Sequence, residues 1–239
     1  MSDAEAAQVE ASPERRAVNS LLSATLLAFT GGSLDAFLYL NHGKVFAGAM
    51  TGNAVFAGIA LLSHDHYNTL HHLLPIVAFM VGVWCEQLFN EHVPHPVILG
   101  LGAEIVVLFT ASLLPLTFPD NLFIAAIAFI AAYQIASFRR VDEYTYNSTF
   151  MTGNLRDAIE ALHGILHSEH RRESLRKFRD FGLVVLCFIT GAMCGALLAP
   201  RVFNHTLWLP AATLAVVLAM VVACDLRGPE EETKGASSV

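Results

Sequence analysis

Long apolar segments recur along this 239-residue chain, and they restrict its fold more than any other feature. Crossing the hydrocarbon core of a bilayer takes roughly 17–25 residues of helix. Only 15% of the residues are charged, and the apolar segments lack the polar stripe that buried helices of soluble proteins usually keep. The sequence therefore predicts an all-α integral membrane protein with about six transmembrane helices. The six segments cover residues 18–40, 73–89, 97–118, 122–138, 181–198 and 207–224.

The tetrapeptide Met-Thr-Gly-Asn occurs twice, as a first motif at residues 50–53 and a second motif at residues 151–154. The similarity continues beyond the motifs, since Phe-Met-Val-Gly-Val-Trp-Cys at residues 79–85 aligns with Phe-Ile-Thr-Gly-Ala-Met-Cys at residues 188–194. Similarity kept in the same order in both halves predicts an internal duplication. In membrane proteins, corresponding Gly-containing segments of two repeats point to a site at the repeat interface.

The charged residues predict how the repeats lie in the membrane. The second motif segment carries Arg156, Asp157 and Glu160, and each charge near the bilayer centre is costly. If neither motif segment spans fully, only Lys44 and Arg201 among the Lys and Arg residues near the spans face outside, so the positive-inside rule favours six spans with both termini cytoplasmic. Three spans per half make the two repeats inverted. Each repeat would then carry an additional broken or re-entrant motif helix.

Composition and the duplication divide the chain into four parts. The polar, Glu-rich ends are typical of disorder, and the N-terminal end lacks the basic region of a cleavable signal peptide. The four parts are a disordered cytoplasmic N-terminus (1–17), membrane repeat 1 (18–118), membrane repeat 2 (119–225) and a disordered C-terminal tail (226–239).

The sequence Thr-Gly-Asn is typical of a helix start. Thr and Asn side chains accept hydrogen bonds from free backbone N–H groups, and Gly permits a close backbone approach. We expect helices to begin at Asn53 and Asn154, after irregular lead-in segments at residues 41–48 and 143–150, and to aim their positive ends inward. Two such helix starts facing each other would form a polar, anion-accepting centre. The motif residues predicted for this site are Thr51, Gly52, Asn53, Thr152, Gly153 and Asn154.

Close helix packing is the alternative interpretation of the same glycines. Gly48 and Gly52 have the spacing i, i+4, as do Gly191 and Gly195, and small residues at this spacing let membrane helices approach closely. Small residues at this spacing also allow two copies of the protein to pack as a homodimer. The sequence alone leaves both alternatives open.

Three polar residues within the spans complete the predicted site. Asp35 lies in the first span, where an ionisable group often marks an ion or proton path. The alternative is a structural acid bonded to nearby Thr or Asn side chains. Glu104 is a second acid that could instead be neutral and hydrogen-bonded, and Gln134 precedes the second motif and could instead be a packed polar residue.

The eleven histidines and four cysteines form no metal-binding or disulfide pattern. Four of these histidines crowd one predicted loop, where we expect them to be solvated; they are His64, His66, His71 and His72. No nucleophile motif or phosphate-binding loop is present, and no basic patch with interleaved aromatic residues indicates nucleic acid. We therefore expect no enzyme activity, cofactor, metal or nucleic-acid partner.

Three stretches carry a resemblance to a known family; they are Gly32–Tyr39, Phe46–Asn53 and Thr149–Asn154. They resemble the YoaK family, mainly bacterial multi-span membrane proteins with a domain of unknown function. The resemblance covers roughly residues 18–224 and implies about six spans in the cell inner (plasma) membrane. It supplies no substrate and no catalytic residue. Ala136 stands where the offset between the motifs would place a partner for Asp35, so any acid site is asymmetric.

The leading hypothesis is a small secondary transporter or permease-like protein in the lipid bilayer. Its central site would lie at the two motifs and bind a small molecule or ion, with Asp35 coupling a proton or cation. The alternative is a membrane scaffold or interaction protein whose motifs serve helix packing, and an intramembrane enzyme comes third. A polar cavity that reaches Asn53, Asn154 and Asp35 would favour the transporter.

Overall fold

The computed structural model of the protein describes residues 20–138, 140–141, 144–145, 151–167 and 171–236. The predicted disordered N-terminus (1–17) and most of the predicted lead-in to the second motif lie outside these residues. The described elements are α3 (Leu21–Asn41), α4 (Met50–Leu62), α5 (His66–His92), α6 (Pro96–Ser112), α7 (Asp120–Ser137), β1 (Arg140–Val141), β2 (Tyr144–Thr145), α8 (Met151–His167), α9 (Arg171–Val202), the 3-10 helix η1 (Phe203–Leu207) and α10 (Trp208–Ala236).

The fold is helical, with one short antiparallel strand pair, β1 and β2. Helices α3, α5 and α7 and the continuous helical stretch 171–226 are each long and apolar enough to cross a membrane. That stretch contains α9, η1 and most of α10. Helices α4 and α6 are apolar but shorter, at 13 and 17 residues. The predicted class, an all-α membrane protein, therefore agrees with the structure.

Helix α10 extends further than expected. It continues to Ala236, into the segment 226–239 that composition predicts to be a disordered tail. Glu230, Glu231 and Glu232 lie in this extension, and Glu is among the better helix-forming residues.

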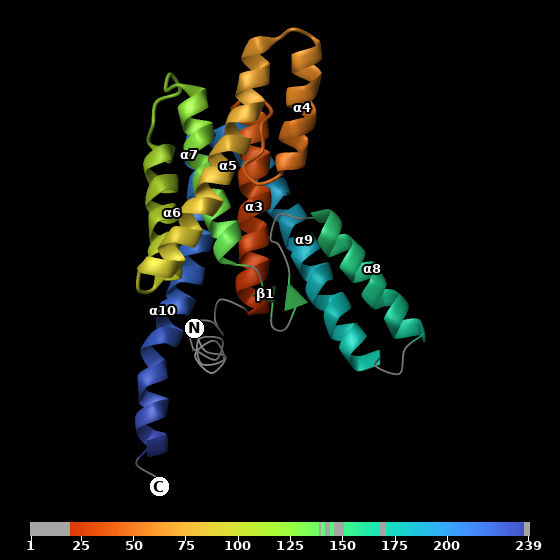
Figure 1. Cartoon of the computed structure of the whole chain (residues 1–239), viewed down its shortest axis with the longest axis vertical. Coiled ribbons are helices and arrows are strands. Elements are labelled where there is room, and N and C mark those ends of the chain that lie inside the picture. The colour runs from red at the N-terminus through yellow and green to blue at the C-terminus, as the bar shows by residue number, and fades with distance from the viewer. Residues whose placement is uncertain (1–19, 139, 142–143, 146–150, 168–170, 237–239) are drawn as a thin grey trace.

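The two motif helices begin within the bundle rather than at its ends (Figure 1). Helix α3 runs from the lower end upward, and α4 starts part of the way along it and continues to the upper end. Helix α7 runs downward, and α8 starts at a middle level and descends. Helix α3 begins and α10 ends toward the same end of the bundle.

The helices contact one another in corresponding pairs across the two halves. Helix α3 packs on α9, and α7 packs on α5. Helix α4 packs on α5, and α8 packs on α9. Helix α3 also contacts α10, as α7 contacts α6. Each of these three contacts therefore occurs twice, once from α3 or α4 and once from α7 or α8.

Glycines bring the backbones of α3 and α9 into close contact. A Cβ added to Gly32 would overlap the carbonyl oxygen of Phe188, and a Cβ added to Gly191 would overlap that of Phe29. Gly191 therefore serves the close helix packing that its small-residue pattern predicts.

Helices α5 and α7 cross in a similar way. A Cβ added to Gly82 would overlap the carbonyl oxygen of Phe129 on α7. Gly82 is the residue that aligns with Gly191, so corresponding glycines mark the two close crossings.

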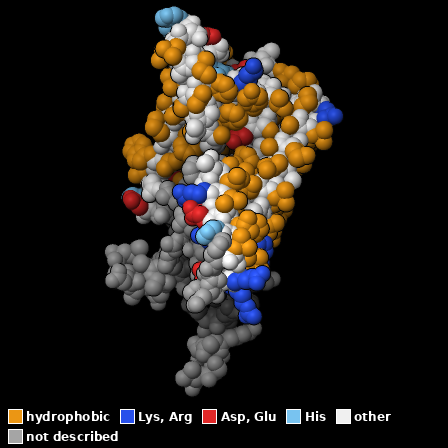
Figure 2. Space-filling view, turned by 90° about the vertical axis from the view of Figure 1, so that its right-hand side faces the viewer, with side chains coloured by type: hydrophobic (Ala, Val, Ile, Leu, Met, Phe, Trp, Pro, Cys, Tyr) orange, Lys and Arg blue, Asp and Glu red, His pale blue; other side chains and the backbone are white. Residues whose placement is uncertain are grey.

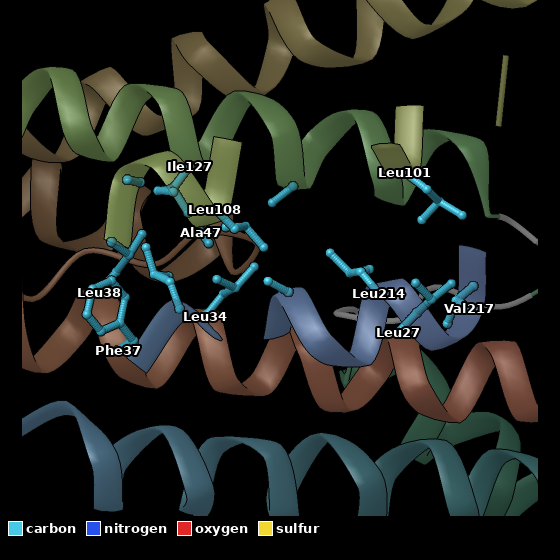
Figure 3. Close-up of a cluster of buried hydrophobic side chains, with 14 of the residues drawn as sticks. Leu27, Leu34, Phe37, Leu38, Ala47, Leu101, Leu108, Ile127, Leu214 and Val217 are labelled. Atoms are coloured by element: carbon cyan, nitrogen blue, oxygen red, sulfur yellow. The ribbon is translucent and has the colours of Figure 1, made fainter. Parts of the chain in front are cut away.

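A shared hydrophobic core joins the two halves (Figure 3). Leu34 and Phe37 of α3 meet Leu108 of α6, Ile127 of α7 and Leu214 of α10 in one buried cluster. A second cluster joins Ala24 and Ala28 of α3 to Ala158 of α8 and to Phe181 and Val184 of α9. Helices of both halves therefore pack against α3.

Candidate functional site

The starts of the two motif helices line one cavity. The cavity has a volume of about 810 Å³ and is bounded by residues of α3, α4, α5, α8, α9 and the loop between α3 and α4. Met50 and Thr51 line it from α4, and Met151 and Thr152 line it from α8. The structure therefore brings together parts of both motifs, which are far apart in the sequence.

Asp35 lies on the wall of this cavity and holds the loop between α3 and α4 (residues 42–49, the lead-in loop). Its side chain is 5% exposed, and Oδ1 accepts a hydrogen bond of 2.8 Å from the backbone N–H of Gly48. The N–H groups of Ala47 and Ala49 also interact with this carboxyl group. Its other oxygen, Oδ2, is buried without a hydrogen-bond partner among the described residues. Asp35 thus fixes the lead-in loop through Oδ1, while Oδ2 is enclosed by the protein without a hydrogen bond from the described residues.

Aromatic side chains form much of the remaining wall. They are Tyr39, Phe46, Phe56, Phe79 and Phe188. The rings of Tyr39 and Phe46 stack with their centroids 5.3 Å apart, and those of Phe46 and Phe56 with theirs 6.5 Å apart. No Lys, Arg or His is among the described residues that line the cavity. The site is therefore an apolar, aromatic cavity with one acidic group.

Figure 2 shows the face of the molecule that carries α4 and α8. Apolar side chains cover most of the described part of this face, and an acidic side chain is visible in a hollow among them.

The motif asparagines do not line the cavity. Asn53 is fully buried; its Nδ2 donates to the carbonyl oxygen of Phe46, and its Oδ1 accepts from the N–H of Phe46, both at 2.9 Å. Helix α4 begins at Met50, not at Asn53 as expected, because Asn53 bonds to the lead-in loop instead of capping a helix start. Asn53 therefore closes the lead-in loop onto the first turn of α4.

The second motif is placed in a comparable way. Helix α8 begins at Met151, not at Asn154 as expected. Gly153 and Asn154 are buried and, like Asn53, lie outside the cavity lining. In the first motif, Gly52 lies against the ring of Phe46, where an added Cβ would come within 2.7 Å of a ring carbon.

Glu104 and Gln134 lie elsewhere in the bundle. Glu104 of α6 is 1% exposed and Gln134 of α7 is 3% exposed, and their side chains interact with each other. Neither lines the cavity. Of the predicted site residues, the structure thus places Asp35, Thr51 and Thr152 at the cavity. The glycines and asparagines of both motifs lie outside the cavity lining, and Glu104 and Gln134 form a separate buried polar pair.

Sequence analysis missed the aromatic wall, although one signal pointed to it. Phe79 aligns with Phe188 in the two similar sequence segments, and both residues line the cavity. Corresponding residues therefore face the cavity at three positions, which are Met50 and Met151, Thr51 and Thr152, and Phe79 and Phe188.

The histidines before and within α5 have two different environments. His64 and His66 are exposed, as expected, but His71 and His72 are buried within α5, so the expectation of solvated loop residues is wrong for these two. His71 Nδ1 lies 2.9 Å from Asn121 Oδ1, and its Nε2 lies 3.2 Å from the carbonyl oxygen of His42.

His42 in turn extends this polar cluster. Its Nδ1 lies 2.8 Å from Oδ1 of Asp120 at the start of α7. Over the described part of the chain, no group of His, Cys, Asp and Glu residues could hold a metal ion. The cluster therefore joins α3, α5 and α7 near one end of the bundle.

Comparisons with known proteins agree with the membrane class. A family model described as a protein of unknown function (DUF1275) matches residues 23–220. The UPF0700 transmembrane protein YoaK of Bacillus subtilis (strain 168) is 27% identical over 201 residues, which are 80% of this chain and 88% of that relative. No solved structure matches the chain.

Proposed function

Because this chain belongs to the DUF1275 family of proteins of unknown function, as its resemblance to the YoaK family predicts, we propose its function from the geometry of the central cavity. The protein is a small secondary transporter or permease-like protein, and the cavity between the two motifs binds its substrate. Its partners are the lipid bilayer and a small-molecule or ion substrate. The proposal includes no catalysis, cofactor or nucleic acid.

One observation carries the proposal. Three pairs of corresponding residues from the two halves line the same cavity as the buried acid Asp35. Packing alone would not require corresponding residues to border an open space. Ligand sites at the interface of two repeats, built with interrupted helices, are characteristic of secondary transporters.

The arrangement of the helices supports an inverted repeat. Helices α3, α4, α5 and α6 run up, up, down and up in Figure 1, and α7, α8, α9 and α10 run in the respective opposite directions. The corresponding contacts and the corresponding Gly82 and Gly191 crossings fit the same relation. We infer six spans, with α4 and α8 as re-entrant motif helices that start in the middle of the bundle.

In this mechanism the two halves move relative to each other about the crossings of α3 with α9 and α5 with α7, and the cavity becomes open to one side of the membrane at a time. Asp35 couples a proton or cation to this movement. Since the same carboxyl group holds Gly48 of the lead-in loop, a change in its charge acts directly on the loop that leads into α4. The location is the inner (plasma) membrane with both termini cytoplasmic.

A specific observation favours the alternative function, a non-transporting scaffold or interaction protein. Asn53 is satisfied by the backbone of Phe46, and Gly191 serves a helix crossing. These parts of the duplicated sequence stabilise the fold and need no substrate. A scaffold would keep the cavity dry or filled by lipid. A homodimer would have to use small residues other than Gly191 and Gly195, which are buried against α3.

Cysteine accessibility distinguishes the two functions. Single cysteines replace Thr51 or Thr152 in a variant without the four native cysteines, and a small water-soluble thiol reagent is added to membranes. The matched controls are Ala57→Cys and Ala158→Cys, on the same helices but buried away from the cavity. We expect the threonine positions to react and the alanine positions to stay unreactive.

An exposed position, His64→Cys, verifies that the reagent is active. If Thr51→Cys and Thr152→Cys react as slowly as the alanine controls while His64→Cys reacts, the cavity is closed to water. The transporter proposal then fails, and the scaffold takes its place.

A further inference from the structure

We propose that the central cavity recognises a bulky organic cation with a single positive charge, such as a quaternary ammonium or phosphonium compound. The inference rests on the proposed function and names the substrate class of the same site. It follows from the charge, the lining and the size of the cavity.

The charge of the lining favours a cation. Among the described residues that line the cavity, Asp35 is the one with a charged side chain, and none is basic. Its Oδ1 accepts from Gly48, whereas Oδ2 is buried without a partner in the described structure. A buried carboxylate without a countercharge is costly, and a cation in the cavity would compensate its charge. An anion would instead be repelled, although the helix starts alone led us to expect an anion-accepting centre.

The aromatic wall favours an organic cation over a hydrated metal ion. Five aromatic side chains line the cavity together with Asp35. Aromatic rings attract organic cations through their quadrupoles, and binding sites for quaternary ammonium groups are commonly built from such rings. A hard cation such as Ca²⁺ needs about six to eight oxygen ligands, whereas Asp35 is the one carboxyl group among the described residues that line the cavity.

The size of the cavity favours a bulky ligand. Its volume of about 810 Å³ lies within the usual range of sites for small organic molecules, roughly 300–1,000 Å³. Thr51 and Thr152 add hydroxyl groups at the two motif helices. One carboxyl group in a mostly apolar space fits one positive charge within an apolar body.

The test compares two probes of closely similar shape and opposite charge, tetraphenylphosphonium and tetraphenylborate. Equilibrium binding of each radiolabelled probe is measured on the purified full-length protein in detergent. We expect tetraphenylphosphonium to bind and tetraphenylborate to bind at least about tenfold more weakly, a difference of about 1.4 kcal/mol.

Two variants with opposite expectations locate the charge. Asp35→Asn keeps an oxygen that can accept from Gly48 but removes the charge, so it should weaken tetraphenylphosphonium binding at least about tenfold and strengthen tetraphenylborate binding. Glu104→Gln also removes a buried acid, but outside the cavity, and should leave both affinities unchanged. Stronger tetraphenylborate binding by Asp35→Asn would also show that this variant keeps its cavity.

The aromatic contribution has its own variant. Phe188→Leu keeps an apolar side chain of similar size on α9, so it should fold, and it should weaken tetraphenylphosphonium binding more than tetraphenylborate binding. Equal loss for both probes would mean that the ring contributes only apolar surface.

The proposal is overturned if both probes bind equally to the wild type, or if Asp35→Asn binds tetraphenylphosphonium as the wild type does. If neither probe binds but Thr51→Cys and Thr152→Cys react with the thiol reagent, the cation class is wrong and the transporter proposal stands. If those cysteines are also unreactive, the proposed function fails as well.

Discussion

Replacing Gly191 by alanine should separate helices α3 and α9 and lower the stability of the protein. The added methyl group would lie 2.7 Å from the carbonyl carbon of Phe29 and 2.8 Å from its Cα, and it would overlap the carbonyl oxygen. Ordinary van der Waals contact begins at 3.4 Å, so the two backbones must move apart by at least 0.7 Å (3.4 − 2.7) for the carbonyl carbon alone. The obstructing atoms belong to a helix backbone, which cannot rotate away as a flexible side chain could.

The expected cost follows from two opposing effects. Adding a methyl group to a well-packed contact typically costs about 1–3 kcal/mol. Alanine in place of glycine within a helix recovers up to about 1 kcal/mol. Because the overlapping atoms belong to a helix backbone, the cost lies in the upper part of that range, at about 2–3 kcal/mol. Subtracting about 1 kcal/mol leaves a net loss of about 1–2 kcal/mol, which lowers the Tm of a protein of this size by roughly 2–8 °C.

Gly182→Ala on the same helix is the matched control. An added Cβ at Gly182 would meet nothing within 4 Å, so only the gain in helix propensity remains and the Tm should stay the same or rise. Tm is measured for both variants and the wild type by tryptophan fluorescence in the same detergent. If Gly191→Ala melts at or above the wild-type temperature, the close crossing of α3 and α9 is wrong.

Three further predictions concern the loops and the topology. Asn53→Ala leaves the N–H and the carbonyl group of Phe46 without their partner, so the Tm should fall by several degrees, at roughly 1–3 kcal/mol for each unpaired buried group; an unchanged Tm would show that this pairing is not formed. Hydrogen bonds from the backbone and the side chain of Asn68 hold the pKa of Asp65 below its usual value. At a pH above the usual Asp pKa, this carboxylate therefore stabilises the start of α5. The stabilisation is lost as the pH falls through the lowered pKa of the folded protein. Asp65→Ala should therefore lower the Tm at neutral pH, and the difference from the wild type should shrink as the pH is lowered below the usual Asp pKa; a difference that does not change with pH would contradict the assignment. With six spans and cytoplasmic termini, a cysteine at His64 should react with an impermeant reagent added to intact cells, and one at Arg172 should react only after the membrane is opened.

The apolar segments carry most of the information about the fold, because a bilayer imposes length and composition directly. The motif helix starts are shifted from Asn53 and Asn154 to Met50 and Met151 for a physical reason. In the first motif, Asn53 pairs with the backbone of Phe46, a contact created by the path of the lead-in loop. Residue propensities do not contain that path.

The candidate site could be predicted in part. Asp35 stands out in sequence because a charge in a span is rare, and Thr51 and Thr152 stand out because they are repeated. Phe56 does not stand out, since apolar side chains are common throughout such a chain and only the packing selects those at the cavity. The burial of His71 and His72 was missed for a related reason, because exposed histidines precede them closely.

The pairing of α3 with α9 also bears on how the protein is made. Helix α9 begins about 130 residues after α3 ends, which is roughly 7–26 s of synthesis at about 5–20 residues per second. During this time the close-packing surface around Gly32 lacks its partner helix from the second half. The first half must therefore remain in the membrane without its partner helices, in contact with lipid or with the insertion machinery. Insertion and assembly are separate steps for this chain, and the later helices complete a structure that the earlier ones cannot form alone.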